Sequence, residues 1–325
     1  MLIILYFLAL ILGIIGAWSI NKLAFKWGLI DSPNDRSSHE RPTPKGGGIG
    51  ILAAFTFASL FLKLSFTFWV PIACIALVSF FGDRLDLSPT LRLPLQFIAA
   101  ILVLLLISDL WPLTSLYSFL LTVFFVVFIV ATANWYNFMD GINGIAGITG
   151  IVGFGLLAAF NILNVGDSQF TILSICIAFA CLGFLPFNIP KAKVFMGDVG
   201  SILLGFVFAA IVVLISKSFL DYVCLIGFLF PFYADEFVTM AIRLKDSENL
   251  LKPHRRHFYQ ILANEMGIAH WKVSMGYGIL QLIVGLSVLW LRNLGIYAVL
   301  SILIIFFIGF IWVNYAFRIR IEKRG

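Results

Sequence analysis

Long apolar runs alternate with short polar segments along the whole chain, and each run ends at charged residues, proline or glycine. A run of about 20 apolar residues is enough for a helix to cross a bilayer, and the pattern predicts about eleven such helices. We expect them near residues 2–24, 47–62, 66–82, 93–108, 114–133, 142–163, 169–186, 199–216, 219–241, 273–291 and 294–317. The predicted fold class is therefore all-α, a polytopic integral membrane protein.

Composition agrees with this pattern. Hydrophobic residues make up 61% of the 325 residues and charged residues only 12%, whereas about 25% of a soluble domain is charged. A soluble enzyme and a disordered regulator are thereby excluded. We treat residues 1–325 as one transmembrane domain, in which residues 273–325 form two carboxy-terminal spans and a basic tail.

The basic residues indicate an orientation in the membrane. The net charge is +6, which in a membrane protein reports topology rather than a nucleic-acid partner. All Lys and Arg except Lys63, Lys217 and Arg292 fall in alternate polar segments. The positive-inside rule places those segments in the cytoplasm, so we expect an extracytoplasmic amino terminus and a cytoplasmic carboxy terminus.

The polar chemistry gathers on that same side, because all four His and most of the acids lie there or at the adjoining helix ends. A transporter would need polar groups near the middle of the membrane, within reach of both sides. The distribution therefore favours chemistry at the cytoplasmic surface.

The first polar segment, DSPNDRSSHERPTPKGGGIG at 31–50, carries Lys45 and ends in a glycine run that opens a helix. Free backbone N–H groups at such a helix start suit a phosphate. The alternative is a basic loop that only sets topology.

The second polar segment, FGDRLDLSPTLRLPLQ, places Asp83 and Asp86 three residues apart, so in a helix they share a face, and Arg92 follows. Acids at the end of a membrane helix are costly unless they serve a function. Snorkelling and capping are the alternative.

The third polar segment, NWYNFMDGINGIAG, brings Asn137, Asp140 and Asn143 into a three-residue rhythm. Asn137 and Asp140 would project together and offer an amide oxygen and a carboxylate. Mg²⁺ prefers such hard oxygen donors and completes its shell with phosphate and water.

In the fourth polar segment, KVFMGDVGS, Asp198 starts the next span. It serves there either as a helix cap or as a second Mg²⁺ ligand.

The fifth polar segment begins inside the ninth predicted span, where Pro231 loosens the helix. Asp235 and Arg243 then lie eight residues apart on one helical face, and PHRRH follows. The candidate substrate-binding residues of this segment are Asp235, His254, Arg255 and His257. Arg in particular binds phosphate bidentately. A basic cluster beside a membrane can instead bind anionic lipid.

Together the five segments provide an acidic, metal-capable group and two basic, phosphate-capable loops on one membrane face. A divalent cation bridging a diphosphate, with Arg and Lys balancing charge, is the equipment of phosphoryl transfer. It requires neither a redox centre nor a covalent nucleophile.

In combination and order, the motifs SPNDRSSHERPTPKGGG, DRLDLSPTLRL, NFMDGINGIAG, VFMGDVGS and PHRRHFYQ resemble those of the polyprenyl-phosphate N-acetylhexosamine-1-phosphate transferases. This is the family of MraY and WecA, and the resemblance over about 28–262 is greatest to the WecA- and WbpL-like bacterial branch. It implies that a UDP-N-acetylhexosamine gives its sugar-1-phosphate to undecaprenyl phosphate and releases UMP. It further implies an enzyme of the bacterial inner membrane that begins O-antigen or related envelope glycans.

The resemblance also assigns roles within the acidic group. Asn137 and Asp198 correspond to metal ligands for Mg²⁺, or for Mn²⁺ in its place. Asp140 corresponds to the family's acid before glycine, which would order water or a phosphate. Asn143 corresponds to a position near the uracil.

Among the basic residues, Arg92 corresponds to a residue on the diphosphate, and His254 and Arg255 correspond to the phosphate-binding loop near the sugar nucleotide. Lys45 is assigned to the lipid phosphate. Homodimers occur in the family, and no span is an obvious dimer face.

Two departures from the family pattern matter. Relatives usually carry paired Asp where this chain has Gly82-Asp83, and the first Asp is often proposed as the base for the lipid phosphate. We hypothesise that Asp83 contributes most to catalysis and Asp86 second. The His-rich triplet typical of MraY is also missing, so the branch implies UDP-GlcNAc, UDP-GalNAc or a 6-deoxy N-acetyl sugar instead of a pentapeptide-bearing donor.

Two alternatives to the enzyme stay open at this point. A secondary transporter would require an internal repeat or paired broken helices, and the sequence has no convincing repeat. A catalytically impaired lipid-binding homologue is favoured by Gly82 alone.

Overall fold

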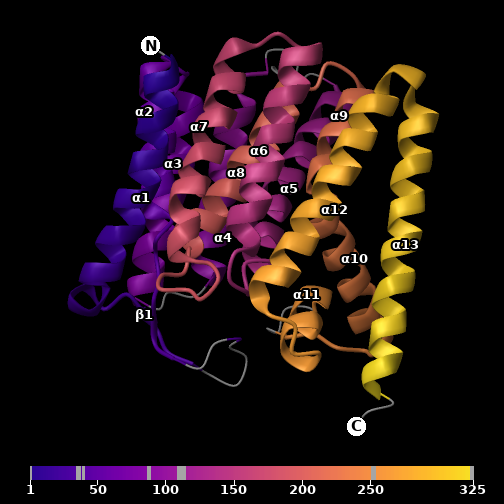
Figure 1. Cartoon of the computed structure of the whole chain (residues 1–325). Helices are drawn as coiled ribbons and strands as arrows, with labels where there is room; N and C mark the ends of the chain where they lie inside the picture. Colours follow the sequence, from indigo (N-terminus) through magenta and orange to yellow (C-terminus); the bar gives the residue numbers. More distant parts are fainter. Residues whose placement is uncertain are drawn as a thin grey trace.

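The computed structural model describes residues 2–33, 38, 41–85, 89–107, 115–249 and 254–322. Its long helices run side by side between two ends of the molecule, and the amino and carboxy termini lie at opposite ends (Figure 1). An odd number of crossings predicts this arrangement of the termini. The loops that carry β1 and the short helix α11 lie at the lower end in Figure 1.

Thirteen α-helices are described, and several are extended or joined by short helical turns. The α-helices are α1 Leu2–Trp27, α2 Ile49–Phe61, α3 Phe66–Leu85, α4 Pro89–Leu104, α5 Leu116–Phe138, α6 Ile145–Asn164, α7 Ser168–Phe184, α8 Asp198–Ile215, α9 Phe219–Ile226, α10 Phe230–Lys245, α11 Phe258–Gln260, α12 His270–Leu291 and α13 Ile296–Glu322. The turns are η2 Leu185–Phe187, η3 Gly227–Leu229, η4 Ile261–Glu265 and η5 Arg292–Leu294.

Within the described residues, nine helical segments are long and apolar enough to cross a membrane. The two other predicted spans correspond to shorter apolar helices, Ile49–Phe61 and Arg92–Leu104. The ninth predicted span is divided into α9, η3 and α10, with Pro231 at the second residue of α10. The predicted class, a helical polytopic membrane protein, is confirmed.

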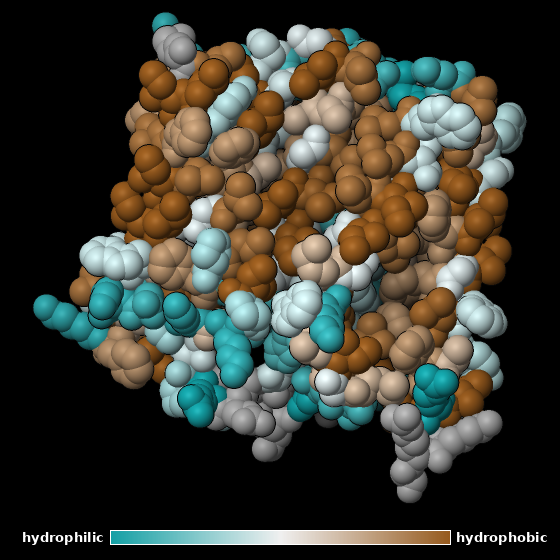
Figure 2. Space-filling view, viewed as in Figure 1, coloured by the Kyte–Doolittle hydropathy of each residue, from teal (hydrophilic) through white to brown (hydrophobic). Residues whose placement is uncertain are grey.

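The surface is that of a membrane protein. Apolar side chains cover the middle of the molecule in Figure 2, and hydrophilic ones gather most densely at the lower end. Exposed apolar residues are numerous on the outer helices, among them Ile4, Phe119, Trp290 and Trp312. Because lipid is as apolar as these side chains, their exposure carries no cost within a bilayer.

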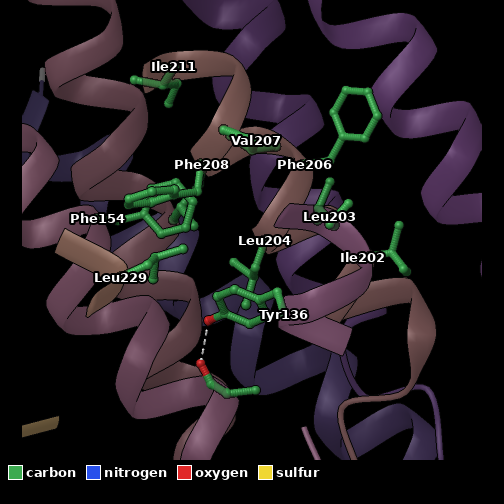
Figure 3. Packing of buried hydrophobic residues seen from close by; sticks show 14 of the residues in the cluster. Tyr136, Phe154, Ile202, Leu203, Leu204, Phe206, Val207, Phe208, Ile211 and Leu229 are labelled. Carbon is green, nitrogen blue, oxygen red and sulfur yellow. Dashed lines mark hydrogen bonds between the residues drawn. The ribbon is translucent and has the colours of Figure 1, made fainter. Parts of the chain in front are cut away.

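The core is built around α8, which is buried along almost its whole length. A helix that is apolar on every face has no side to turn toward water, and α8 is such a helix. Phe206 and Phe208 are fully buried on it, and Figure 3 shows Phe154 and Leu229 of neighbouring elements packed beside Phe208. The Tyr136 hydroxyl donates to the Ala146 carbonyl at 2.7 Å and so joins α5 to α6.

The first polar segment adds a small strand pair that an all-α prediction did not include. β1 Ile30–Asp31 pairs antiparallel with β2 Thr43–Pro44. The chain then lies along residues 195–196, where Gly47 N–H donates to the Phe195 carbonyl and Gly48 N–H to the Met196 carbonyl, both at 2.9 Å. This contact fixes the glycine run against the start of α8.

Glycine is required in this contact because the two backbones nearly touch. A Cβ on Gly48 would lie 2.4 Å from the Gly200 Cα, so Gly48→Ala should destabilise the protein by about 1–3 kcal/mol through overpacking. Thermal unfolding of the detergent-purified protein would measure this loss. In the matched control Gly155→Ala, the new Cβ meets nothing within 4 Å, and stability should stay constant or rise. Equal unfolding midpoints for both variants would contradict the expectation.

Candidate active site

A cavity of about 330 Å³ opens at the end of the bundle where the polar segments meet. Its described walls include six residues predicted from the sequence, drawn from four of the five polar segments: Lys45, Asp83, Asn137, Asp140, Asn143 and Asp198. The fifth segment contributes Gln260, the last residue of the PHRRHFYQ motif, and His270, neither of which was assigned a role from the sequence. Segments far apart in the chain thus share one small space.

Asp198, the first residue of α8, is the centre of the polar contacts. Its Oδ1 accepts a hydrogen bond from the Asn137 amide at 2.8 Å, and its Oδ2 accepts one from the Arg92 guanidinium. The Asn137 amide also reaches the Ser201 hydroxyl at 2.8 Å. Asn137 and Asp198, the two predicted metal ligands, are therefore direct neighbours.

Asp83 reaches the same point from the last turn of α3. Its Oδ2 accepts a hydrogen bond from the Asp198 backbone N–H at 2.9 Å, and its Oδ1 lies 3.8 Å from Lys45 Nζ. A carboxylate beside a helix N-terminus is electrostatically favourable. Asp83 thereby joins the first, second and fourth polar segments.

Asp140 lies in the turn between α5 and α6 and makes the cavity strongly acidic. Burial, followed by the negative charges of Asp198 and Asp83, raises the pKa of Asp140 well above its ordinary value. Each neighbouring carboxylate disfavours a further negative charge, and a divalent cation among them would relieve this repulsion. The carboxyl groups of Asp83, Asp140 and Asp198 thus share the site with two basic side chains, Lys45 and Arg92.

The donor set fits Mg²⁺ bound partly through substrate. Among the residues that the structure describes, no group of three or more His, Cys, Asp and Glu side chains forms a preformed metal cage. Mg²⁺ usually takes one or two carboxylates and completes its octahedron with phosphate oxygens and water. Asp198 and the amide of Asn137 match that kind of site.

Gly82, the residue before Asp83, lies next to the Arg92 side chain. A Cβ at Gly82 would lie 3.2 Å from Arg92 Cζ and Nε, and Arg92 is buried. The first Asp of the family pair would consequently face the guanidinium that binds Asp198. Asp86, the second candidate carboxylate, lies outside the described residues.

Asn143 is held at the cavity edge through its backbone. Its carbonyl accepts a hydrogen bond from the Ser274 hydroxyl at 2.8 Å, and its N–H donates to His270 Nδ1 at 3.4 Å. The amide group extends toward the Pro190 carbonyl at 3.5 Å. The start of α12 therefore supports the third polar segment.

The remaining predicted residues of the fifth segment lie away from the cavity walls. Asp235 is fully buried and accepts hydrogen bonds from Phe258 N–H at 2.8 Å and the Tyr277 hydroxyl at 2.7 Å. His257, also buried, lies 3.7 Å from Asp235 and 3.6 Å from Glu236. Asp235 and His257 thus fix the segment from within, and Glu236 is a buried acid that sequence reasoning missed.

His254 and Arg255 are half-buried at the start of the described part of this segment. The His254 ring lies 4.8 Å from the His257 ring. Next to them, Arg256 forms ion pairs with Asp246 and Glu248. Ion pairs within the fifth segment therefore connect residues 254–257 to the residues that follow α10.

Comparison with known proteins shows which family the sequence resembles. The sequence model of glycosyl transferase family 4 matches residues 65–216. The undecaprenyl-phosphate alpha-N-acetylglucosaminyl 1-phosphate transferase of Thermotoga maritima is 29% identical over 290 residues, which cover 82% of this chain and 84% of the relative. The phospho-N-acetylmuramoyl-pentapeptide-transferase of Staphylococcus aureus strain JH9 is 35% identical over 130 residues, 39% of this chain and 38% of the relative.

The central part of the chain, residues 65–216, thus resembles glycosyl transferase family 4, and both relatives are phospho-sugar transferases by name. This is the family of MraY and WecA that the sequence motifs predicted. The segment matched by the family 4 model contains Asp83, Asn137, Asp140 and Asp198. These four residues, which we call the acidic centre, therefore lie within the matched range, whereas Lys45 and the fifth segment lie outside it.

The stability that His254 of the fifth segment contributes should depend on pH. Burial, and then the positive charges of His257 and Arg243, lower the pKa of His254 to about 4, compared with an ordinary value of about 6.5. The folded protein therefore binds fewer protons here than the unfolded chain. Stability from His254 is fully present above about pH 6.5 and is lost as the pH falls toward 4.

We expect thermal unfolding midpoints to reveal this loss. Between pH 7 and pH 4.5, the midpoint of His254→Gln should fall less than that of the unmodified protein, and above pH 7 the difference should be constant. Parallel curves over the whole range would contradict the assignment.

Proposed function

We propose that this protein transfers N-acetylhexosamine-1-phosphate from a UDP-N-acetylhexosamine to undecaprenyl phosphate and releases UMP. The product would be the lipid diphosphate sugar on which an O-antigen or related envelope glycan is begun. The observation that carries the proposal is the meeting of Asp83, Asn137, Asp140 and Asp198 with Lys45 and Arg92 at one end of a membrane-spanning bundle.

The proposed reaction balances without any further reactant. An oxygen of the acceptor phosphate attacks the β-phosphorus of the donor, and the bond from that phosphorus to the bridging oxygen of the diphosphate breaks. The bridging oxygen leaves with UMP. A phosphate monoester has its second pKa near about 6, so the acceptor is largely dianionic at neutral pH and needs little deprotonation.

Asp83 and Lys45 would bind and orient the acceptor phosphate. Lys45 would attract the phosphate, and Asp83, at 3.8 Å from the ammonium, would fix the lysine and take up a residual proton. The carboxylate of Asp83 is itself held by the backbone of Asp198. These two side chains would therefore orient the attacking group without forming a covalent intermediate.

Arg92 and the acidic centre would act on the donor. Asn137 and Asp198 would hold Mg²⁺, which supplies Lewis-acid neutralisation of the diphosphate when bound. Arg92 positions the Asp198 carboxylate through their hydrogen bond, and Asp140 would order water or a phosphate oxygen. Asn143 and the fifth segment would contact the nucleotide.

We place the cavity on the cytoplasmic face of a bacterial inner membrane. The basic residues gather in the polar segments that build the site, as the positive-inside rule expects for cytoplasmic loops. On that face the cavity would reach both a soluble nucleotide sugar and the phosphate of a lipid embedded in the bilayer.

The reaction can be tested by UMP release. Purified protein in detergent would be given undecaprenyl phosphate, a panel of UDP-N-acetyl sugars, and Mg²⁺, Mn²⁺ or EDTA. We expect UMP with one donor sugar only when both the lipid and the metal are present. A folded protein that releases no UMP from any donor would favour the impaired lipid-binding homologue, for which Gly82 is the one sequence feature.

The role of Asp83 can be tested separately. Asp83→Asn keeps the size of the side chain but removes the charge beside Lys45, so kcat should fall by about 100-fold because the acceptor phosphate is misplaced. Asp167→Asn is the matched control, because Asp167 caps α7 at the opposite end of the bundle and Asn also caps helices well. Wild-type turnover in Asp83→Asn would exclude the proposed role.

A further inference from the structure

One tyrosine hydroxyl joins the fifth polar segment to the turn that carries Asn137 and Asp140. Tyr259 of α11 is fully buried, and its hydroxyl donates to the Phe138 carbonyl oxygen at 2.9 Å. Phe138 is the last residue of α5, directly after Asn137 and two residues before Asp140. The bond therefore reaches the backbone of the predicted metal-binding turn.

The same hydroxyl occupies the space that a side chain at Gly141 would need. A Cβ on Gly141 would lie 2.2 Å from the Tyr259 oxygen and 3.1 Å from two ring atoms. Gly141 is not among the glycines with positive φ, so its requirement is room and not backbone freedom. Tyr259 and Gly141 consequently fit each other as a pair.

The other end of Tyr259 is fixed to the membrane helices. Its backbone N–H donates to Asp235 of α10 at 3.2 Å, and Asp235 also accepts the hydroxyl of Tyr277 from α12. The Tyr259 ring stacks on His257 with centroids 5.7 Å apart. The ring thus has little freedom to follow a movement of the turn.

The hydroxyl remains a donor at any working pH. Burial, and then the negative charges of Asp235 and Asp140, raise the pKa of Tyr259 well above its ordinary value of 10. The adjacent residue, Gln260, lines the catalytic cavity. One rigid element therefore contacts both the cavity wall and the acidic turn.

We propose that Tyr259 is a positioning residue, which holds the turn of Asn137 and Asp140 in register with the fifth polar segment. The inference rests on the proposed function, because the geometry it maintains serves that reaction. Misplacement of a reacting group by about 1 Å can cost about 100-fold in rate, and one hydrogen bond to the turn can prevent such a shift.

The test begins with Tyr259→Phe, which removes the hydroxyl and keeps the ring. We expect kcat for UMP release to fall by about 10-fold and the Mg²⁺ concentration for half-maximal activity to rise, with a smaller change in KM for the UDP-sugar. Tyr233→Phe is the matched control, since it removes another buried hydroxyl contact, to Thr132 at 2.9 Å, which lies within α5 and not in the turn. Its kinetics should match those of the unmodified protein.

A rescue experiment tests the contact itself. Gly141→Ala should lose activity because its Cβ meets the Tyr259 oxygen, and adding Tyr259→Phe should restore part of that loss. Non-additive effects of this kind indicate direct coupling of neighbouring residues. A double variant no better than Gly141→Ala would count against the pairing.

Hydrogen–deuterium exchange separates this inference from the proposed function. In folded Tyr259→Phe, amides of residues 139–144 should exchange faster than in the unmodified protein and in Tyr233→Phe. This readout applies even if the unmodified protein releases no UMP, which would overturn the proposed function alone. Unchanged exchange, or unchanged kcat and Mg²⁺ dependence in an active enzyme, would overturn the positioning role.

Discussion

The amino-terminal end of α8 is the constraint on which the rest of the site depends. Asp198 opens this helix and contacts Arg92 and Asn137 through its side chain and Asp83 through its backbone. Because α8 is buried on all sides, its end cannot shift without moving the helices around it. The residues around Asp198 are therefore held in place by α8, the most buried of the described long helices.

Close backbone contact makes this arrangement possible. The glycine run of the first polar segment lies on residues 195–200, where Gly48 and Gly200 leave no room for a Cβ. Lys45 is carried on the same stretch and so reaches Asp83. Small residues here bring a basic side chain into an acidic cavity, where its charge is balanced instead of being exposed to lipid.

A second set of buried polar groups supports the other side of the cavity. Asp235 gathers donors from α11 and α12, and the same carboxylate anchors Tyr259, whose hydroxyl reaches the turn before α6. The turn η3 separates α9 from α10, and α10 has Pro231 as its second residue and carries Asp235. The fifth segment is thereby connected both to the membrane helices and to the turn that carries Asn137 and Asp140.

The sequence by itself determined the helical membrane class, the side on which polar groups gather, and six residues of the cavity, because hydropathy and local motifs act through residues near in the chain. It could not determine that Asp235 and His257 would be buried supports, that His270 and Gln260 would line the cavity, or that Tyr259 would meet Gly141. Those features arise where segments far apart in the chain pack together, as Gly141 and Tyr259 do. Only the tertiary structure decides whether a polar side chain is buried against other parts of the protein or lines the cavity.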